Sequence, residues 1–476
     1  MLGLFGSLNL GARSLATQQQ GIETAGHNLA NVNNPAYARQ RINIQTANTI
    51  PSPVGPIGTG AYVTSIQQIR DALLDQHIQG ETSVGNFLDS KQTALNYAQA
   101  LLGQEIDRQA TGAEGAAAAN GAGGSHGIAD YLSNFFSSLQ SLSTNPSSLT
   151  ERQNVLAQAQ NLAGRFNQID AGLAELNTSL NSSVAQDVKT ANLLISSIAD
   201  LNKQIVTAEA GTPGSANDLR DLRQQKIEDL SKLVNVQTSN EANGAVDLAI
   251  AGSSMVSGVN VLDTLQTYDD GNGQTMVQAA TAGAHLTLTS GSIQGTIDAR
   301  DGTIQTLRTS LNTMAGQLIT EVNAVHQAGY SLTGTTGATF FDGTDASSIK
   351  VNSALIGNPA LLQAAGTNGA VGDNTVALVL AQLADKKLPG LSNQSFSQNF
   401  SQTVAVFGQA LSSVNSDIGD QELVQNMLQG QRDSVSGVSL DEEMTDMMKF
   451  QKAYQASARL ITTLDEMLDT VLAMKR

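Results

Sequence analysis

The chain of 476 residues contains no cysteine and no tryptophan, and only 4% of its residues are aromatic. The missing cysteine excludes disulfide bonds and thiolate metal sites, and the few aromatic residues leave a core to be built from Leu, Ile, Val, Ala and Met. Basic residues are also scarce, because 25 Lys and Arg stand against 42 Asp and Glu, for a formal net charge of -17. A nucleic acid or an anionic membrane requires a basic face, so we expect neither as a partner.

Long hydrophobic runs are missing as well. No window approaches the roughly 18 apolar residues of a membrane-spanning helix. The N-terminal segment MLGLFGSLNLGARS lacks the basic region and the long apolar region of a secretory signal. The residues alone therefore predict a protein that is cytoplasmic, or one that is exported with its N-terminus intact.

Patterns of catalysis and metal binding are absent too. The five His are scattered, and no pair has the i, i+4 spacing of a helical zinc site. The Gly-rich stretch 111–127 lacks the ending of a phosphate loop, and the turn 269–273 lacks the terminal Glu of a calcium loop. We predict no catalytic, cofactor-binding or metal-binding residue, and a protein that is not an enzyme.

Seven-residue apolar stripes are present at both ends of the chain. The N-terminal stripe comprises Leu4, Leu8, Leu15, Ile22 and Leu29, and Gly11 and Gln18 interrupt its adjacent row. The C-terminal stripe comprises Leu440, Met447, Phe450, Tyr454, Ile461, Leu464, Leu468 and Val471. This spacing predicts amphipathic helices with coiled-coil-like seams over 1–32 and 440–474. Ser439 and Glu442 have the spacing of a capping box at the start of the second helix.

A single amphipathic helix is most often one face of a globular core, but here two stand at opposite ends of one chain. One such helix is unstable alone in water, and a pair is marginal. We therefore expect these stripes to form an assembly interface with further copies of the chain, and the ends to become ordered on assembly.

Between the stripes, helical periodicity, alternation and Gly/Pro breaks divide the chain. The fold class we expect is α+β and mainly α, with long terminal helices, a helical bundle and a small β insert. Separate helices are predicted over 150–180 and 184–209, and a flexible loop over 111–127. The predicted regions are an N-terminal helix with an extended segment (1–70), a first helical part (71–234), a β insert (235–290), a second helical part (291–435) with a β-like stretch (331–352), and a C-terminal helix (436–476).

Three motifs resemble those of the flagellar axial proteins, which form the rod, the hook and the hook-associated structures. Residues 26–40, GHNLANVNNPAYARQ, are similar to the N-terminal signature of that family, and residues 439–468 resemble its shared C-terminal helix. The residues 216–231 and 291–326 are similar to the central region of the hook-associated protein 1 family, the junction members. The signature residues carried over from the family are Asn28, Leu29, Ala30, Asn31, Pro35, Tyr37 and Arg39.

The resemblance implies a structural subunit of the hook–filament junction of the bacterial flagellum, secreted through the flagellar export channel. It implies as partners further copies of the chain, the hook protein, the second hook-associated protein and a cytoplasmic export chaperone that binds near the C-terminus. Two alternatives stay open: a hook or distal-rod subunit, and an exported hydrolase or peptidase on a flagellar scaffold. Hook and rod proteins are mainly β in the central region, whereas helical patterns occupy it here.

Overall fold

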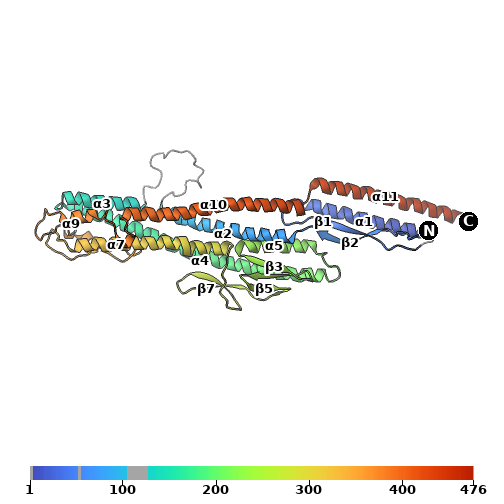
Figure 1. Ribbon diagram of the computed structural model, residues 1–476, viewed down its shortest axis with the longest axis horizontal. Coiled ribbons are helices and arrows are strands. Elements are labelled where there is room, and N and C mark those ends of the chain that lie inside the picture. Colours follow the sequence, from blue (N-terminus) through green and yellow to red (C-terminus); the bar gives the residue numbers. More distant parts are fainter. Residues whose placement is uncertain (1–3, 52–54, 104–126, 475–476) are drawn as a thin grey trace.

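The computed structural model describes residues 4–51, 55–103 and 127–474, which form a long, narrow molecule in two parts (Figure 1). A body of helices occupies one end, and a thinner extension that contains both ends of the chain projects from the other. We call this extension the terminal rod. It consists of α1 (Leu4–Ala30), α11 (Leu440–Ala473) and a hairpin of β1 (Gln40–Thr46) and β2 (Ala61–Gln68). The loop predicted over 111–127 lies, except for its last residue, outside the described residues.

The body is a bundle of helices of very different lengths. Its short elements gather between α7 and α10 and form the end of the body away from the terminal rod, the distal tip (Figure 1). The mainly helical α+β class predicted from the sequence is confirmed. The helices are α2 (Ala72–Leu102), α3 (Ile128–Thr144), α4 (Leu149–Ala208), α5 (Asn217–Leu233), α6 (Ser292–Asp298), α7 (Gln305–Gln327), α8 (Ser353–Gly357), α9 (Thr375–Gln382) and α10 (Phe396–Ser436), with the two-residue strands β9 (Phe341–Asp342) and β10 (Lys350–Val351) at the tip.

Helix α4 runs for 60 residues without a break, so the prediction of two helices, 150–180 and 184–209, is wrong. The apolar pattern is interrupted at Asn181, Ser182 and Ser183, none of which is a strong helix breaker. The interruption marks a change of partner instead. Up to Leu180, α4 packs into the large core of the body, and from Val184 onward it packs into a second core beneath the β domain.

The β domain covers the second half of α4. A four-stranded antiparallel sheet in the order β3-β4-β5-β6 lies beside the separate hairpin β7-β8. Arg300, fully buried in a π-helical turn between α6 and α7, donates to the Thr275 carbonyl oxygen at 2.9 Å and so ties β8 to the bundle. The strands are β3 (Val236–Asn240), β4 (Val246–Ile250), β5 (Ser253–Ser257), β6 (Asn260–Val261), β7 (Leu265–Asp269) and β8 (Thr275–Ala279).

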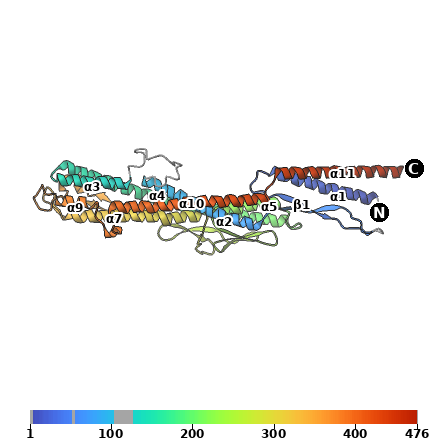
Figure 2. The same cartoon turned by 45° about the horizontal axis from the view of Figure 1, so that its top comes forward.

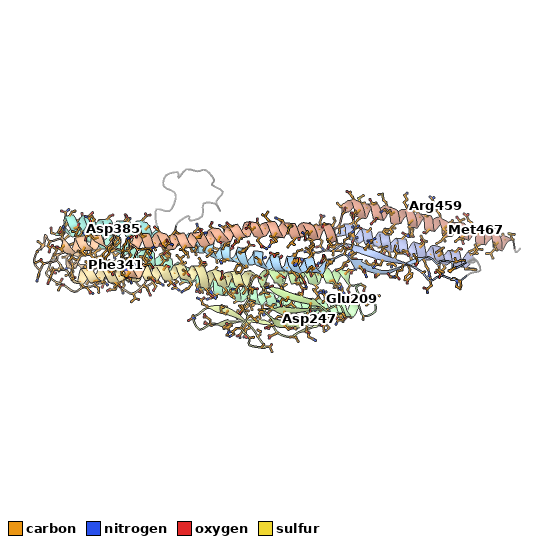
Figure 3. The ribbon with its side chains drawn as sticks, viewed as in Figure 1. Glu209, Asp247, Phe341, Asp385, Arg459 and Met467 are labelled. Atoms are coloured by element: carbon orange, nitrogen blue, oxygen red, sulfur yellow. The ribbon has the colours of Figure 1, made fainter. Side chains whose placement is uncertain are left out.

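The distal tip is held together by buried polar side chains, close to the buried Phe341 marked in Figure 3. Arg152 donates to the carbonyl oxygens of Pro146 and Leu362, and no carboxylate of the described residues forms an ion pair with it. The His326 ring is fully buried: its Nδ1 lies 2.8 Å from the Ala338 carbonyl oxygen, and its Nε2 accepts from the Gln363 N–H at 2.9 Å. Burial lowers the pKa of His326 to about 4 and that of Arg152 to about 10.

Acid should therefore weaken the body through His326. The unfolded chain binds a proton near pH 6.5 and the folded chain only near pH 4, so stability present above pH 6.5 is lost as the pH falls toward 4. The difference corresponds to about 3 kcal/mol of unfolding free energy. Urea unfolding followed by circular dichroism at pH 7.0 and pH 4.5 measures it. His326→Gln should reduce this loss by most of that amount, and an unchanged loss in the variant would contradict the assignment.

Candidate functional site: the joint between terminal rod and body

Three stretches far apart in the sequence meet where the terminal rod joins the body. They are the turn between α1 and β1, the first half of α5, and the break between α10 and α11, which lie together in Figure 1. We call this region the joint. Each stretch overlaps one of the three motifs singled out in the sequence, so the joint brings all three together.

Asn28, only 1% exposed, lies at the centre of the joint. Its Nδ2 donates to the Gln40 carbonyl oxygen at 2.9 Å and to Glu443 Oε2 at 3.0 Å. Its Oδ1 accepts from the Gln40 N–H at 2.9 Å and from the Tyr37 hydroxyl at 2.7 Å. These bonds use both donors and both acceptor positions of the amide. Burial raises the pKa of Tyr37, so its hydroxyl keeps the proton that it donates.

Arg39 connects the turn after α1 to the first turn of α11. Its Nε donates to Glu443 Oε1 and its Nη1 to Glu442 Oε2, both at 2.6 Å. Ser439 is the N-cap of α11 but makes no side-chain cap hydrogen bond, so the predicted capping box is wrong. Glu442 binds Arg39 instead, because a charge-assisted hydrogen bond is stronger than one to a neutral N–H.

Helix α5 attaches this turn to the body through two acidic residues one turn apart. Asp218 Oδ1 accepts from Gln40 Nε2 at 2.8 Å, and Asp221 Oδ2 accepts from the Ala38 N–H at 3.2 Å. Arg70 lies between Asp221 and Asp75, 3.0 Å from each. Burial raises the pKa of Asp221, although Arg70 opposes this. The charges of the joint are thus largely buried and paired, an arrangement that fixes orientation more than it adds stability.

A second buried arginine fixes the end of α10. Arg432 is 8% exposed; its Nη2 lies 2.9 Å from Glu228 of α5, and its Nε lies 3.8 Å from Asp75 of α2. The joint thereby holds α2, α5 and α10 of the body against the turn that leads into the terminal rod.

Of the signature residues, the structure brings Asn28, Tyr37 and Arg39 together. Asn31, just after α1, donates to the His27 carbonyl oxygen at 3.0 Å, Leu29 is half-buried, and Ala30 and Pro35 are exposed. Sequence reasoning missed the partners of these residues on other elements. Those on α5 lie inside the central motif, which could have pointed to them. The missed residues are Arg70, Asp75, Asp218, Asp221, Glu228 and Arg432.

Removing the charge of Arg70 should loosen the joint. Arg70→Met keeps much of the side-chain volume but leaves Asp221 buried without its cation and Asp75 with only Arg432 at 3.8 Å, which should cost about 3–5 kcal/mol. Arg41→Met is the matched control, because Arg41 is exposed on β1 and its loss should change stability by less than about 0.5 kcal/mol. Denaturant unfolding and amide exchange over residues 34–46 measure the effect. Equal stability of the two variants would contradict a structural role for Arg70.

The two stripes lie against each other in the terminal rod. Helices α1 and α11 run antiparallel, with Ser14 hydrogen-bonded to Ser457 at 2.8 Å. Close contacts are made at two glycines: a Cβ on Gly11 would lie 2.8 Å from Ile461, and one on Gly21 would lie 2.6 Å from the Phe450 ring.

This pairing covers the stripe residues only in part. Leu464 is buried, whereas Leu440, Tyr454 and Val471 are exposed. The remaining stripe residues are half-buried, namely Leu4, Leu8, Leu15, Ile22 and Leu29 on α1 and Met447, Phe450, Ile461 and Leu468 on α11.

A groove of about 430 Å³ opens between α1, β1 and α11. Gly21, Ile42, Ile44 and Phe450 contribute apolar walls, and Arg39, Arg41 and Asp446 line its polar part. In the part of the chain that the structure describes, no group of three or more His, Cys, Asp or Glu residues is placed to hold a metal ion. None of its helices there is long and apolar enough to cross a membrane.

Comparisons with known proteins give a consistent result. A family model described as the flagellar hook-associated protein FlgK helical domain matches residues 120–341, and the flagellar basal body rod FlgEFG protein C-terminal model matches residues 425–474. The chain is 28% identical to flagellar hook-associated protein 1 of Bacillus subtilis, over 99% of this chain and 98% of that protein. It is 23% identical to the protein of that name from Escherichia coli, over 98% of this chain and 99% of that protein.

A solved structure is also similar. The flagellar hook junction protein FlgK from Burkholderia pseudomallei matches with a TM-score of 0.63 at 16% identity, over 76% of this chain and all of that chain. At this identity the likeness establishes the fold.

Proposed function

Because this chain belongs to the flagellar hook-associated protein 1 family, we propose that its terminal rod is the part through which copies assemble with one another. The chain is a structural component of the hook–filament junction of the flagellum. The match of its centre to a helical hook-associated domain speaks against the hook or distal-rod alternative.

The exposed apolar surface of α11 carries the proposal. Helix α11 is 34 residues long, yet only Glu443 and Leu464 of it are buried. A helix with this much uncovered apolar surface is expected to have a further partner. The large apolar residues that it leaves exposed are Leu440, Met444, Met448, Tyr454, Leu460, Met467, Val471 and Leu472.

The proposed partners are those that the resemblance implies: further copies, the hook protein, the second hook-associated protein, and a cytoplasmic chaperone that covers α11 before export. Secretion through the flagellar channel is supported by the absence of cysteine, since no disulfide could block threading of the chain. We propose no enzymatic role. A hydrolytic activity abolished by a change within 235–290 would restore the hydrolase alternative.

Site-specific labelling tests the assignment. The chain has no cysteine, so Val261→Cys places one thiol at a half-exposed position of the β domain. After reaction of intact flagella with a maleimide–gold reagent, electron microscopy should show label only at the boundary between hook and filament. Unmutated cells are the control. Label along the hook, along the rod or nowhere would overturn the proposed function.

A further inference from the structure

We propose that the terminal rod has two unlike faces, and that one face of each copy packs on the other face of the next copy. This inference rests on the proposed function and specifies the contact through which copies meet. It follows from the position of the hairpin, from the distribution of exposed apolar residues on α11 and from the charges beside them.

The hairpin covers one side of α1 only and lies along it in Figure 2. Thr17 Oγ1 donates to the Ala61 carbonyl oxygen at 3.2 Å, and a Cβ on Gly60 would lie 2.7 Å from Leu10. At 100° per residue, Leu15 and Ile22 lie about 140–160° around α1 from Thr17. The N-terminal stripe therefore runs along the side of α1 that the hairpin leaves open.

The exposed apolar residues of α11 divide between the same two sides. Asp446 and Phe450 line the groove that α11 shares with β1, and so mark the hairpin side. Within about 60° of Asp446 around the helix are Leu460, Met467 and Val471, which are half-exposed; Met467 is marked near the end of the chain in Figure 3. About 120–160° from Asp446 are the exposed residues Leu440, Met444 and Met448.

Two faces result. The hairpin face is the groove of about 430 Å³ with Ile42, Ile44 and Phe450, continued along α11 by Leu460, Met467 and Val471. The open face is the half-buried N-terminal stripe, continued by Leu440, Met444 and Met448. One face is a groove with an apolar wall, and the other is a row of aliphatic side chains that can enter a groove.

Among the described residues, unpaired charges of opposite sign flank the two faces, while Asp446 also lines the groove and Lys452 and Arg459 lie about 120–140° from Asp446 around α11. Arg13 and Arg41 are exposed on the hairpin side, and Asp465 and Asp469 are exposed on the open side of α11. None of these four forms an ion pair within the described part of the chain. Packing the open face on a second open face would bring carboxylates together, whereas packing it on the hairpin face brings them near arginines. The preferred contact is therefore heterologous, and contacts of this type build rings or helical tubes and not closed dimers.

Engineered cysteines distinguish these arrangements in a chain that has none. Ile22→Cys is placed on the open face and combined in turn with Ile44→Cys, Leu460→Cys or Met467→Cys on the hairpin face. Flagella from swimming cells are treated with a mild thiol oxidant and run on a non-reducing gel. At least one combination should give a ladder of dimers, trimers and larger species. Each single variant should remain monomeric. So should Ile22→Cys with Leu193→Cys, the latter at an exposed position of α4 in the body.

Two results would overturn the inference. Dimers from Ile22→Cys alone would show that open faces meet each other, and the lack of a ladder in every combination would show that the two faces do not meet. Leu15→Cys repeats the series from a second open-face position if Ile22→Cys prevents swimming. The Val261→Cys label separates this inference from the proposed function, because label at the junction without any ladder contradicts only the pairing of faces.

Discussion

Cells whose copy of this chain ends before Leu440 should keep their hooks but lose their filaments and stop swimming. The truncation removes α11 and with it the apolar face on which α1 packs. It also removes Glu442 and Glu443, so that Arg39 loses both carboxylates and Asn28 loses one of its four hydrogen bonds in the joint. Electron microscopy of hooks and spreading in soft agar measure the result, and swimming cells would contradict it.

The body should survive that truncation. Neither of the two hydrophobic cores contains a residue of α11, so the purified truncated chain should unfold at nearly the denaturant concentration of the full chain. Its presence in the culture medium shows whether export still operates. A truncated chain that is exported and folded but supports no filament places the defect in assembly.

The sequence predicted the helices and strands well and their partners poorly. The stripes indicated both terminal helices, because a seven-residue repeat depends only on local spacing, and α1 and α11 begin and end within a few residues of the expected positions. The strands β3 to β8 lie between Val236 and Ala279, inside the β insert expected over 235–290. The break predicted inside α4 was wrong because periodicity reports which face is buried and says nothing of which core buries it.

The joint could be only half predicted, since its bonds connect distant parts of the chain. Resemblance singled out Asn28, Tyr37 and Arg39, but Glu443 lies 404 residues from Arg39, and Asp221 lies 183 residues from Ala38. No local pattern encodes such a pair. Glu442 shows the consequence, because its spacing from Ser439 suggested a cap, while a cation brought close by the fold binds it instead.

The glycines of α1 show a further limit of pattern reading. In the sequence Gly11 interrupts an apolar row, which suggests a gap in the seam. In the structure Gly11 is a point of close contact between α1 and α11, and so is Gly21. Only a residue without a side chain lets Phe450 and Ile461 approach the backbone of α1 this closely, so these glycines determine how near the two helices lie.

Gly21→Val should therefore abolish swimming. A Cβ at Gly21 would lie 2.6 Å from the Phe450 ring, so the helices must separate or Phe450 must leave its place, at a cost of about 1–3 kcal/mol in each copy of an assembly. Gly164→Val is the matched control, because Gly164 lies inside a helix of the body, α4, and no atom lies within 4 Å of a Cβ built there.

A compensating change tests the cause of this defect. Phe450→Leu removes the ring but keeps an apolar side chain, so it should restore part of the swimming of Gly21→Val. Soft-agar spreading compares the single and double variants. If Phe450→Leu alone swims normally and the double variant swims no better than Gly21→Val, the defect does not arise from this contact. Partial restoration would show that the separation of α1 and α11, set at Gly21, is what assembly of the terminal rod requires.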